Sequence, residues 1–192
     1  MARTTADQKI DTRRKIVKAA ARAFRSDGAS VGIADIMGEL GLTNGGFYRH
    51  FSSKDDLFVE AACLALDEVG ERLVFAAERA QPGLRRKAII TTYLSPEHVA
   101  NPDSWCVIAA IAGDLGRAPW TIRKRLDAAM FSYIQRLMPY MTGTTPQEQQ
   151  RDVIVLISAM AGAIMMVRTL GDKQMRESVL ALTRDYYLTT FG

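Results

Sequence analysis

The side chains best suited to chemistry lie close together near the N-terminus, in the stretch from Thr43 to Lys54. Asn44 carries an amide that can pair bidentately with adenine, and such a pair reads a base edge in the DNA major groove. The phenol of Tyr48 and the ammonium of Lys54 are suited instead to phosphate oxygens. Together these groups indicate a nucleic-acid-binding surface.

Two short helices joined by a tight turn are predicted to position these side chains. Apolar residues recur at the i, i+3, i+4, i+7 spacing of one helix face between Ile33 and Leu40. Gly41 then supplies the left-handed conformation that ends a helix, and Thr43 offers a hydroxyl to cap the next one. The second helix, expected from Thr43 to His50, turns two phenylalanines inward. A helix–turn–helix of this kind places its second helix in the major groove.

The distribution of charge follows this motif. Residues 1–54 contain ten Lys/Arg and five Asp/Glu, whereas residues 55–192 contain fifteen and sixteen. The positive excess of the chain, which is +4 overall, therefore lies in its N-terminal part. A positive field in that place attracts a phosphate backbone. A solvated basic arm would explain the charge, but not its coincidence with the helix–turn–helix.

The string GLTNGGFYRHFSSKDDLF resembles the end of the DNA-binding domain of TetR-family transcriptional repressors. The resemblance covers roughly residues 9–65, and the rest of the chain matches the family only in length and helical character. It implies that Tyr48 and Lys54 contact phosphates, although Tyr48 can also be a surface aromatic packed on its neighbours. Two residues depart from the family pattern: Asn44 where Lys is frequent, and Gly32 where Thr is frequent.

The predicted DNA-binding residues differ in the group that each would contact. Asn44 is better suited to a base than to a phosphate, and Gly32 leaves only backbone N–H groups to hold a phosphate at the start of its helix. Gly45 and Gly46 each cost a helix about 1 kcal/mol relative to Ala. Either close approach of the backbone to DNA or packing on the first helix explains them. For His50, packing or helix capping is as good an explanation as a DNA contact. The full set is Gly32, Thr43, Asn44, Gly45, Gly46, Tyr48, Arg49, His50 and Lys54.

The apolar periodicity predicts an all-α fold of nine helices. Three belong to an N-terminal helix–turn–helix DNA-binding domain (residues 1–54), and six to a C-terminal ligand-binding and dimerisation domain (residues 55–192). The segment 95–103 is expected to be a loop. The helices are expected at about 8–25, 32–40, 43–50, 54–80, 84–94, 105–115, 119–140, 146–170 and 172–189.

The last two helices carry apolar faces that favour a dimer. The segment from Val153 to Val167 is apolar almost all round, so it must be covered on more than one side. The final helix carries a second apolar seam, formed by Met175, Val179, Leu182 and Tyr186. A four-helix interface with a second copy is predicted, and an ordinary intrachain core is the alternative. The dimer is favoured because a helix–turn–helix reads palindromic half-sites about 34 Å apart, or a multiple of that.

Four residues of the C-terminal part are predicted to line a cavity for a small-molecule effector: Tyr93, Trp105, Cys106 and Phe131. They belong to a wider set of side chains in the helical body that could line a cavity between helices, which also includes His98, Trp120, Tyr133 and several methionines. The same residue types fill the cores of ordinary helical proteins, so plain core packing is the alternative.

An enzyme is the main alternative class of protein. The chain has only two histidines, His50 and His98, and shows neither HExxH nor CxxC spacing. No Gly-rich phosphate loop follows a predicted strand. We therefore expect no catalytic residue, no metal ion and no cofactor.

Three features bear on cellular location. Residues 1–7 lack the apolar core of a signal peptide. The longest apolar run, residues 153–167, is shorter than the ~20 residues that cross a bilayer, so no membrane association is expected. Two cysteines, Cys63 and Cys106, give no disulfide framework and fit a reducing cytoplasm.

These features together predict a cytoplasmic, homodimeric transcriptional repressor. It would bind a palindromic operator in double-stranded DNA and release it when a small-molecule effector binds to the helical body. The alternative is a small all-α enzyme, or a protein-interaction module without DNA binding. That alternative leaves the basic N-terminal part unexplained.

Overall fold

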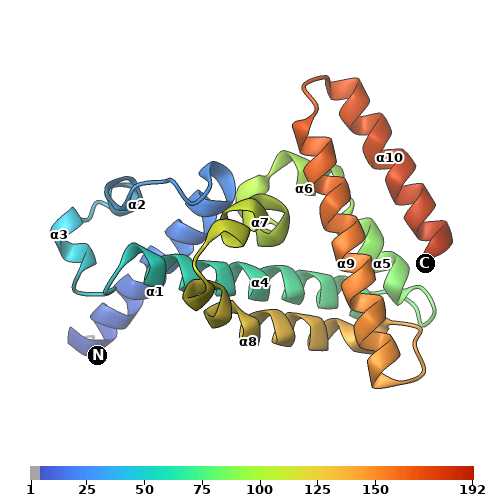
Figure 1. Ribbon diagram of the computed structural model, residues 1–192, viewed down its shortest axis with the longest axis horizontal. Helices are drawn as coiled ribbons and strands as arrows, with labels where there is room; N and C mark the ends of the chain where they lie inside the picture. The colour runs from blue at the N-terminus through green and yellow to red at the C-terminus, as the bar shows by residue number, and fades with distance from the viewer. Residues whose placement is uncertain (1–4) are drawn as a thin grey trace.

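The computed structural model describes residues 5–192, and every regular element in this range is helical (Figure 1). The all-α class is confirmed. Residues 1–4, part of the segment expected to lack a signal peptide, lie outside the described residues. The elements are α1 (Thr5–Asp27), α2 (Ile33–Glu39), α3 (Asn44–Phe47), α4 (Lys54–Arg79), α5 (Arg85–Tyr93), α6 (Pro96–Ala100), η1 (Pro102–Ser104), α7 (Val107–Arg117), α8 (Trp120–Leu137), η2 (Met138–Tyr140), α9 (Pro146–Thr169) and α10 (Lys173–Thr190).

Over residues 5–192 there are ten α-helices and two short 3₁₀ turns, one α-helix more than the nine predicted. The additional helix, α6, lies in the segment 95–103, for which the prediction of a loop is wrong. Ser95 caps α6 by accepting a hydrogen bond from the N–H of His98 at 3.2 Å, and Pro96 occupies its first turn. Five residues are too few to show a helical period, so the apolar pattern does not reveal this helix.

The long helix α4 connects two groups of helices. Figure 1 shows α1, α2 and α3 at one end of the molecule and α5, α9 and α10 towards the other. Ser53 caps α4 by accepting a hydrogen bond from the N–H of Asp56 at 3.1 Å. The helix packs against α1, α5 and α8, and a single buried cluster runs through both groups. The division of the chain at residue 54 therefore stays a prediction.

A buried arginine joins α1 to the rest of the molecule. Arg25 is 5% exposed, and its Nη1 donates to the carbonyl of Trp105 at 3.1 Å. Its Nη2 forms an ion pair of 3.0 Å with Glu68 on α4. Burial lowers the pKa of the Arg25 guanidinium, and Glu68 opposes this effect. Nearby, the N–H of Ala29 donates to the Asp114 carboxylate at 3.1 Å. These bonds fix the first three helices against the body, which we define as residues 80–192 together with the C-terminal part of α4.

The last two helices, α9 and α10, form a pair at the opposite end of the molecule from α3 (Figure 1). Thr145 and Glu148 form a capping box at the start of α9. Hydrogen bonds from the Thr144 hydroxyl and from backbone N–H groups lower the pKa of Glu148 to about 2. The hydroxyl of Tyr187 on α10 donates to the carbonyl of Ala159 at 3.2 Å, which holds the two helices together.

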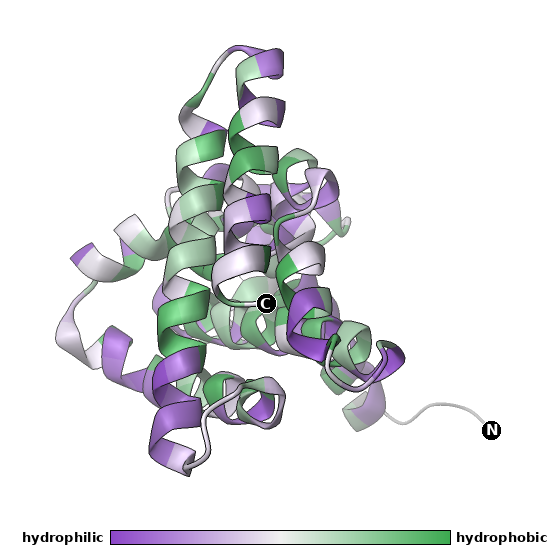
Figure 2. Ribbon diagram, turned by 90° about the vertical axis from the view of Figure 1, so that its right-hand side faces the viewer, coloured by the Kyte–Doolittle hydropathy of each residue, from purple (hydrophilic) through white to green (hydrophobic). Residues whose placement is uncertain are grey.

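One helix of the described chain, α9, is long and apolar enough to cross a membrane by length and composition alone. The helix is 24 residues long, close to the predicted span of 146–170, and is longer than the apolar run of residues 153–167 on which the expectation of no membrane association rests. A core helix passes the same test, and α9 contributes side chains such as Leu156, Met160 and Ile164 to the core. Less than half of its apolar stretch is buried within the chain. Figure 2 shows hydrophobic residues along most of the side of α9 that faces the viewer, and hydrophobic and hydrophilic residues mixed along α10.

Candidate nucleic-acid interface

The predicted helix–turn–helix is formed by α2 and α3. Ile36 and Met37 of α2 are buried, as is Phe47 of α3. Between the helices, Gly41 has a φ of +67°, a left-handed conformation that side chains disfavour. The hydroxyl of Thr43 accepts a hydrogen bond from the N–H of Gly46 at 3.3 Å and so caps α3. The periodicity and the two turn residues therefore act as predicted.

The regular part of the second helix is shorter than the predicted span of residues 43–50. It ends at Phe47 and continues as a tight turn in which the N–H of His50 donates to the carbonyl of Phe47 at 2.9 Å. Phe47 and Phe51 stack with their ring centroids 5.4 Å apart. One bond of the α-helical type persists in this turn, from the N–H of Phe51 to the carbonyl of Phe47 at 3.1 Å, and the buried aromatic pair lies beside Arg13 of α1.

The side chains with DNA-reading chemistry are exposed on this scaffold, and the ring of Tyr48 also meets that of Phe47 edge-on, with centroids 5.2 Å apart. Thr43, Asn44 and Arg49 are exposed, and Tyr48 is 66% exposed. Asn44 begins α3 and makes no side-chain hydrogen bond to the described part of the chain. Because α3 is the second helix of the motif, this surface is the one that a major groove would meet.

The two adjacent glycines of α3 are not required by packing. A Cβ at Gly45 would meet no heavy atom within 4 Å. A Cβ at Gly46 would lie 3.5 Å from the Thr43 hydroxyl and 3.8 Å from Met37 Cε, which are ordinary contacts. Packing on the first helix therefore does not explain Gly45. Close approach of DNA to the backbone at Gly45 stays a prediction.

A basic cleft of about 440 Å³ lies beside α3. It is lined by Gln8, Lys9 and Thr12 of α1 together with Arg49 and His50. Burial lowers the pKa of His50, and the positive charges of Lys9 and Arg49 lower it further. Because its ordinary pKa is already below 7, His50 is neutral at pH 7. The positive charge of the cleft therefore comes from Lys9 and Arg49.

Arg13 holds this region in place and was not recognised from the sequence. Its guanidinium donates to the carbonyl of His50 and pairs with the Glu60 carboxylate of α4. It also lies 4.1 Å from the centroid of the Phe51 ring. Arg13 is thus a positioning residue that joins α1, the end of the α3 turn and α4. Helical spacing places Arg13 on the outer face of α1, but it does not identify these distant partners.

The two remaining predicted residues lie at helix starts. The N–H of Gly32 donates to the Asp35 carboxylate at 3.1 Å, so a negative charge already occupies the start of α2. That charge opposes a phosphate at the same place. Lys54 is half-buried at the start of α4, in a cleft that it shares with Asp114 and Arg117 of α7. The phosphate contacts of Gly32 and Lys54 stay predictions.

Three of the four residues predicted to bind an effector gather in the body. Tyr93, Trp105 and Cys106 are each at most 2% exposed. The ring of His98 links two of them, with its centroid 4.6 Å from that of Tyr93 and 4.7 Å from that of Trp105. We call these four residues, together with the buried Tyr133, the core cluster. Phe131 lies apart from it, because Phe131 is 51% exposed on the outer face of α8.

The core cluster contains polar atoms that lack partners. The hydroxyls of Tyr93 and Tyr133, the Nε2 atom of His98 and the indole nitrogen of Trp105 are buried without a hydrogen bond in the described chain. Burial lowers the pKa of His98 to about 4, so its ring is neutral at pH 7. Its Nδ1 lies 2.6 Å from the Tyr93 carbonyl, which can only accept. Nδ1 therefore carries the proton and Nε2 is an acceptor.

Groups that would indicate metal chemistry are not found in residues 5–192. No three His, Cys, Asp or Glu side chains of this range gather so that they could hold a metal ion. The two thiols lie on different elements, Cys63 half-buried on α4 and Cys106 buried before α7. Burial raises the pKa of both thiols, which disfavours the reactive thiolate.

Comparison with known sequences agrees with the geometry of α2 and α3. The family described as "Bacterial regulatory proteins, tetR family" matches residues 16–61. The HTH-type transcriptional regulator TtgR of Pseudomonas putida is 39% identical over 79 residues. That match covers 41% of this chain and 37% of TtgR. The similarity to curated relatives thus spans little more than a third of their length.

Comparison with solved structures extends over the whole chain. A TetR-family regulator from Cytophaga hutchinsonii has a TM-score of 0.73 at 18% identity, covering 100% of this chain and 98% of that one. A putative transcriptional regulator from Saccharomonospora viridis, solved in complex with choline, has a TM-score of 0.69 at 21% identity, with 93% and 96% covered. At these identities the similarity shows the fold alone.

The open space at Gly45 generates a prediction in which stability and binding change in opposite directions. We expect Gly45→Ala to raise the free energy of unfolding by up to about 1 kcal/mol, because Ala favours a helix and meets no neighbour. The added methyl group would separate the backbone from DNA, and we expect DNA affinity to fall about tenfold. Chemical unfolding and fluorescence anisotropy with a labelled duplex measure the two effects.

Gly38→Ala is the matched control, since a Cβ there also meets no atom within 4 Å but lies on α2. It should raise stability while leaving DNA affinity within about twofold. If Gly45→Ala binds DNA as tightly as the parent protein, the backbone of α3 does not approach DNA closely.

Proposed function

The chain belongs to the TetR family of transcriptional regulators, and we propose that it regulates transcription by binding double-stranded DNA through α3. The observation that carries this proposal is the exposed polar surface of α3, fixed on a buried aromatic scaffold beside the Lys9–Arg49 cleft. The relatives described above are named as regulators, which favours this class over an enzyme.

The proposed contacts divide into base reading and phosphate binding. Asn44 begins α3, where residues of a recognition helix reach base edges, and its free amide suits adenine. The ring of Tyr48 packs edge-on against Phe47 but is 66% exposed, and its phenol would donate to a phosphate oxygen. Lys9 and Arg49 would add phosphate contacts that do not depend on sequence.

Substitution of Asn44 and Tyr48 tests this division. We expect Asn44→Ala to reduce discrimination at one base position per half-site by about 1–3 kcal/mol and to leave non-specific binding nearly unchanged. Tyr48→Phe should weaken good and poor sites by similar factors, because it removes a phosphate bond. A palindromic duplex selected from a random library by the parent protein, and its single-base variants, provide the panel.

The salt dependence of the parent protein is the internal control for that panel. Its affinity should fall steeply and log-linearly with salt, since phosphate contacts release counterions. Absence of DNA binding at low salt would overturn the proposed function. Uniform weakening by Asn44→Ala would reassign that residue to phosphate binding.

We also propose that the protein acts as a homodimer through α9 and α10. These helices expose seven large apolar side chains, more than a soluble monomer usually leaves uncovered on two adjacent helices. A second copy packed on this face would form a four-helix interface and present two copies of α3 to a palindromic site. The exposed residues are Ile154, Val155, Met165, Met166, Met175, Leu182 and Tyr186.

Gly162 provides a test of the dimer because it lies on the exposed side of α9. A Cβ there meets no heavy atom within 4 Å in the chain, so Gly162→Leu should leave the monomer folded. The larger side chain should overpack the interface and raise the dimer dissociation constant about tenfold. Sedimentation analysis measures this constant.

The matched control is Gly116→Leu on α7, which is equally exposed and equally free of neighbours. It should not change the dissociation constant. A parent protein that is monomeric at micromolar concentration would exclude the dimer, and an unchanged constant in Gly162→Leu would place the interface elsewhere.

The proposed regulation is repression released by a small molecule in the core cluster. The cluster offers an acceptor at His98 Nε2 and donors at Trp105 and the two phenols of Tyr93 and Tyr133. Buried polar atoms normally have partners, so an uncharged molecule with both donors and acceptors would suit them. The similar Saccharomonospora viridis protein was solved with a small molecule, choline. This supports a small-molecule-binding role for such a fold.

The position of the core cluster suggests how a ligand would affect DNA binding. Trp105, whose ring stacks on His98, also accepts the hydrogen bond from Arg25 of α1. A ligand that moves the Trp105 backbone would therefore alter the support of the first three helices. Release of DNA requires that the ligand bind the altered arrangement more tightly than the DNA-bound one.

A further inference from the structure

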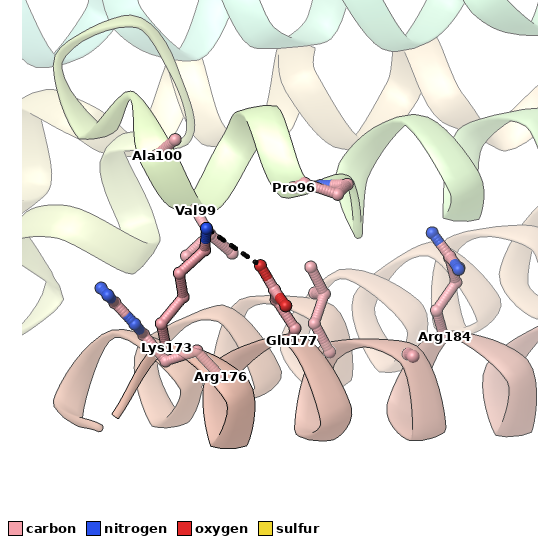
Figure 3. Close-up of a pocket in the computed structure, with 9 residues that line it drawn as sticks. Pro96, Val99, Ala100, Lys173, Arg176, Glu177 and Arg184 are labelled. Atoms are coloured by element: carbon pink, nitrogen blue, oxygen red, sulfur yellow. Dashed lines mark ion pairs between the residues drawn. The ribbon is translucent and has the colours of Figure 1, made fainter. Parts of the chain in front are cut away.

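A groove with an apolar floor and a charged rim lies between α6 and α10 (Figure 3). Its volume is about 370 Å³, which falls at the lower end of the range for small-molecule sites. Both helices contribute apolar side chains to the groove, and all of its charged side chains come from α10. The floor is formed by Pro96, Val99, Ala100, Leu180 and Ala181, and the rim by Lys173, Arg176, Glu177 and Arg184.

The rim has an excess of positive charge. Lys173 and Glu177 form an ion pair of 3.8 Å, which Figure 3 marks with a dashed line. Arg184 lies 3.9 Å from the neighbouring Asp185, a distance at the limit of an ion pair. Arg176 makes no ion pair within residues 5–192 and is half-buried at the rim. A free guanidinium above an apolar floor is suited to an anion that carries an apolar tail.

We infer that this groove binds a linear amphiphile with a single anionic headgroup, such as a medium-chain alkyl carboxylate. The tail would lie on the floor between α6 and α10, where it removes the apolar surface of Val99 and Leu180 from water. The carboxylate would accept bidentate hydrogen bonds from Arg176. The only acid of the rim, Glu177, is already paired with Lys173, so the rim offers no free carboxylate to the cation of a cationic or zwitterionic amphiphile.

The groove remains open in the proposed dimer. Arg176, Leu180 and Arg184 are four residues apart and share one face of α10. The exposed apolar residues Leu182 and Tyr186 occupy the opposite face. A second copy packed on that opposite face would not cover the groove. The site therefore does not depend on the proposed function, and it differs from the core cluster, whose polar atoms are fully buried.

Calorimetric titration of the full chain with decanoate, kept below its micelle-forming concentration, tests the inference. We expect one decanoate per chain. Decanol should bind at least fivefold more weakly, and decyltrimethylammonium should show no saturable binding. Arg176→Glu should weaken decanoate binding at least tenfold, because it replaces the cation that faces the headgroup with an anion. Arg123→Glu, a charge reversal at an exposed arginine of α8, is the matched control and should bind as the parent does.

Ala181→Phe fills the groove and should abolish decanoate binding while circular dichroism shows unchanged helix content. If this variant does not fold, the inference is decided by comparing the decanoate affinities of Arg176→Glu and Arg123→Glu, because neither arginine belongs to the buried core. Decanoate binding that survives in a folded Ala181→Phe protein, or equal affinity for decanol and decanoate, would overturn the inference. These experiments measure decanoate binding alone, so neither result bears on the proposals of DNA binding and dimerisation. A failure of this inference is therefore distinct from a failure of the proposed function.

Discussion

The buried guanidinium of Arg25 is the interaction on which the arrangement of the molecule depends. It lies at the end of α1, where it bonds simultaneously to Ala21 in its own helix, to Glu68 on α4 and to the carbonyl of Trp105 before α7. Removing one partner from a buried charge typically costs about 3–5 kcal/mol, and the partial exposure of Glu68 places this case towards the lower value. The first three helices cannot turn against the body without breaking these bonds.

One series of contacts runs from Arg25 through the core cluster to α9, and so connects the parts proposed to bind DNA, an effector and a second copy. Arg72 of α4 lies 4.2 Å from the ring centroid of Trp105. Trp105 therefore contacts two arginines, Arg72 through its ring and Arg25 through its backbone carbonyl. The ring of Trp105 stacks on His98, and the carbonyl of His98 accepts a hydrogen bond of 2.6 Å from Arg168 on α9. The core cluster therefore touches both the support of α1 and one of the proposed dimer helices. In the proposed dimer, a change in the cluster would therefore have a direct physical route to the spacing of the two α3 surfaces.

The sequence predicted those features that local spacing determines. The apolar period from Ile33 to Leu40, the glycine at the turn and the Thr43 cap are read within a few residues, and each has the predicted role. The effector site predicted at Tyr93 and Trp105 rests on the combination of aromatic rings with polar atoms, and it stays a prediction.

The features that sequence missed depend on distant partners or on very short elements. Arg25 and Trp105 are 80 positions apart, and Arg13 and Glu60 are 47 apart, so no local pattern relates them. Arg13, which helical spacing assigns to a solvated face, packs between helices instead. Phe131 shows the reverse error, since an aromatic residue in an amphipathic helix was expected inside and lies outside. Spacing gives the period of a helix, whereas tertiary packing decides which of its faces is covered.

Coupling between the core cluster and DNA is the central claim, and a two-way titration tests it most directly. A library of small uncharged phenols would be screened by the thermal midpoint of the full chain, with Tyr133→Phe as the control that removes one cluster hydroxyl. For a compound whose stabilising effect is lost in that control, we predict at least a fivefold fall in DNA affinity by fluorescence anisotropy. Reciprocity requires DNA to weaken compound binding by the same factor. A compound that binds through Tyr133 while DNA affinity stays unchanged would contradict the claim.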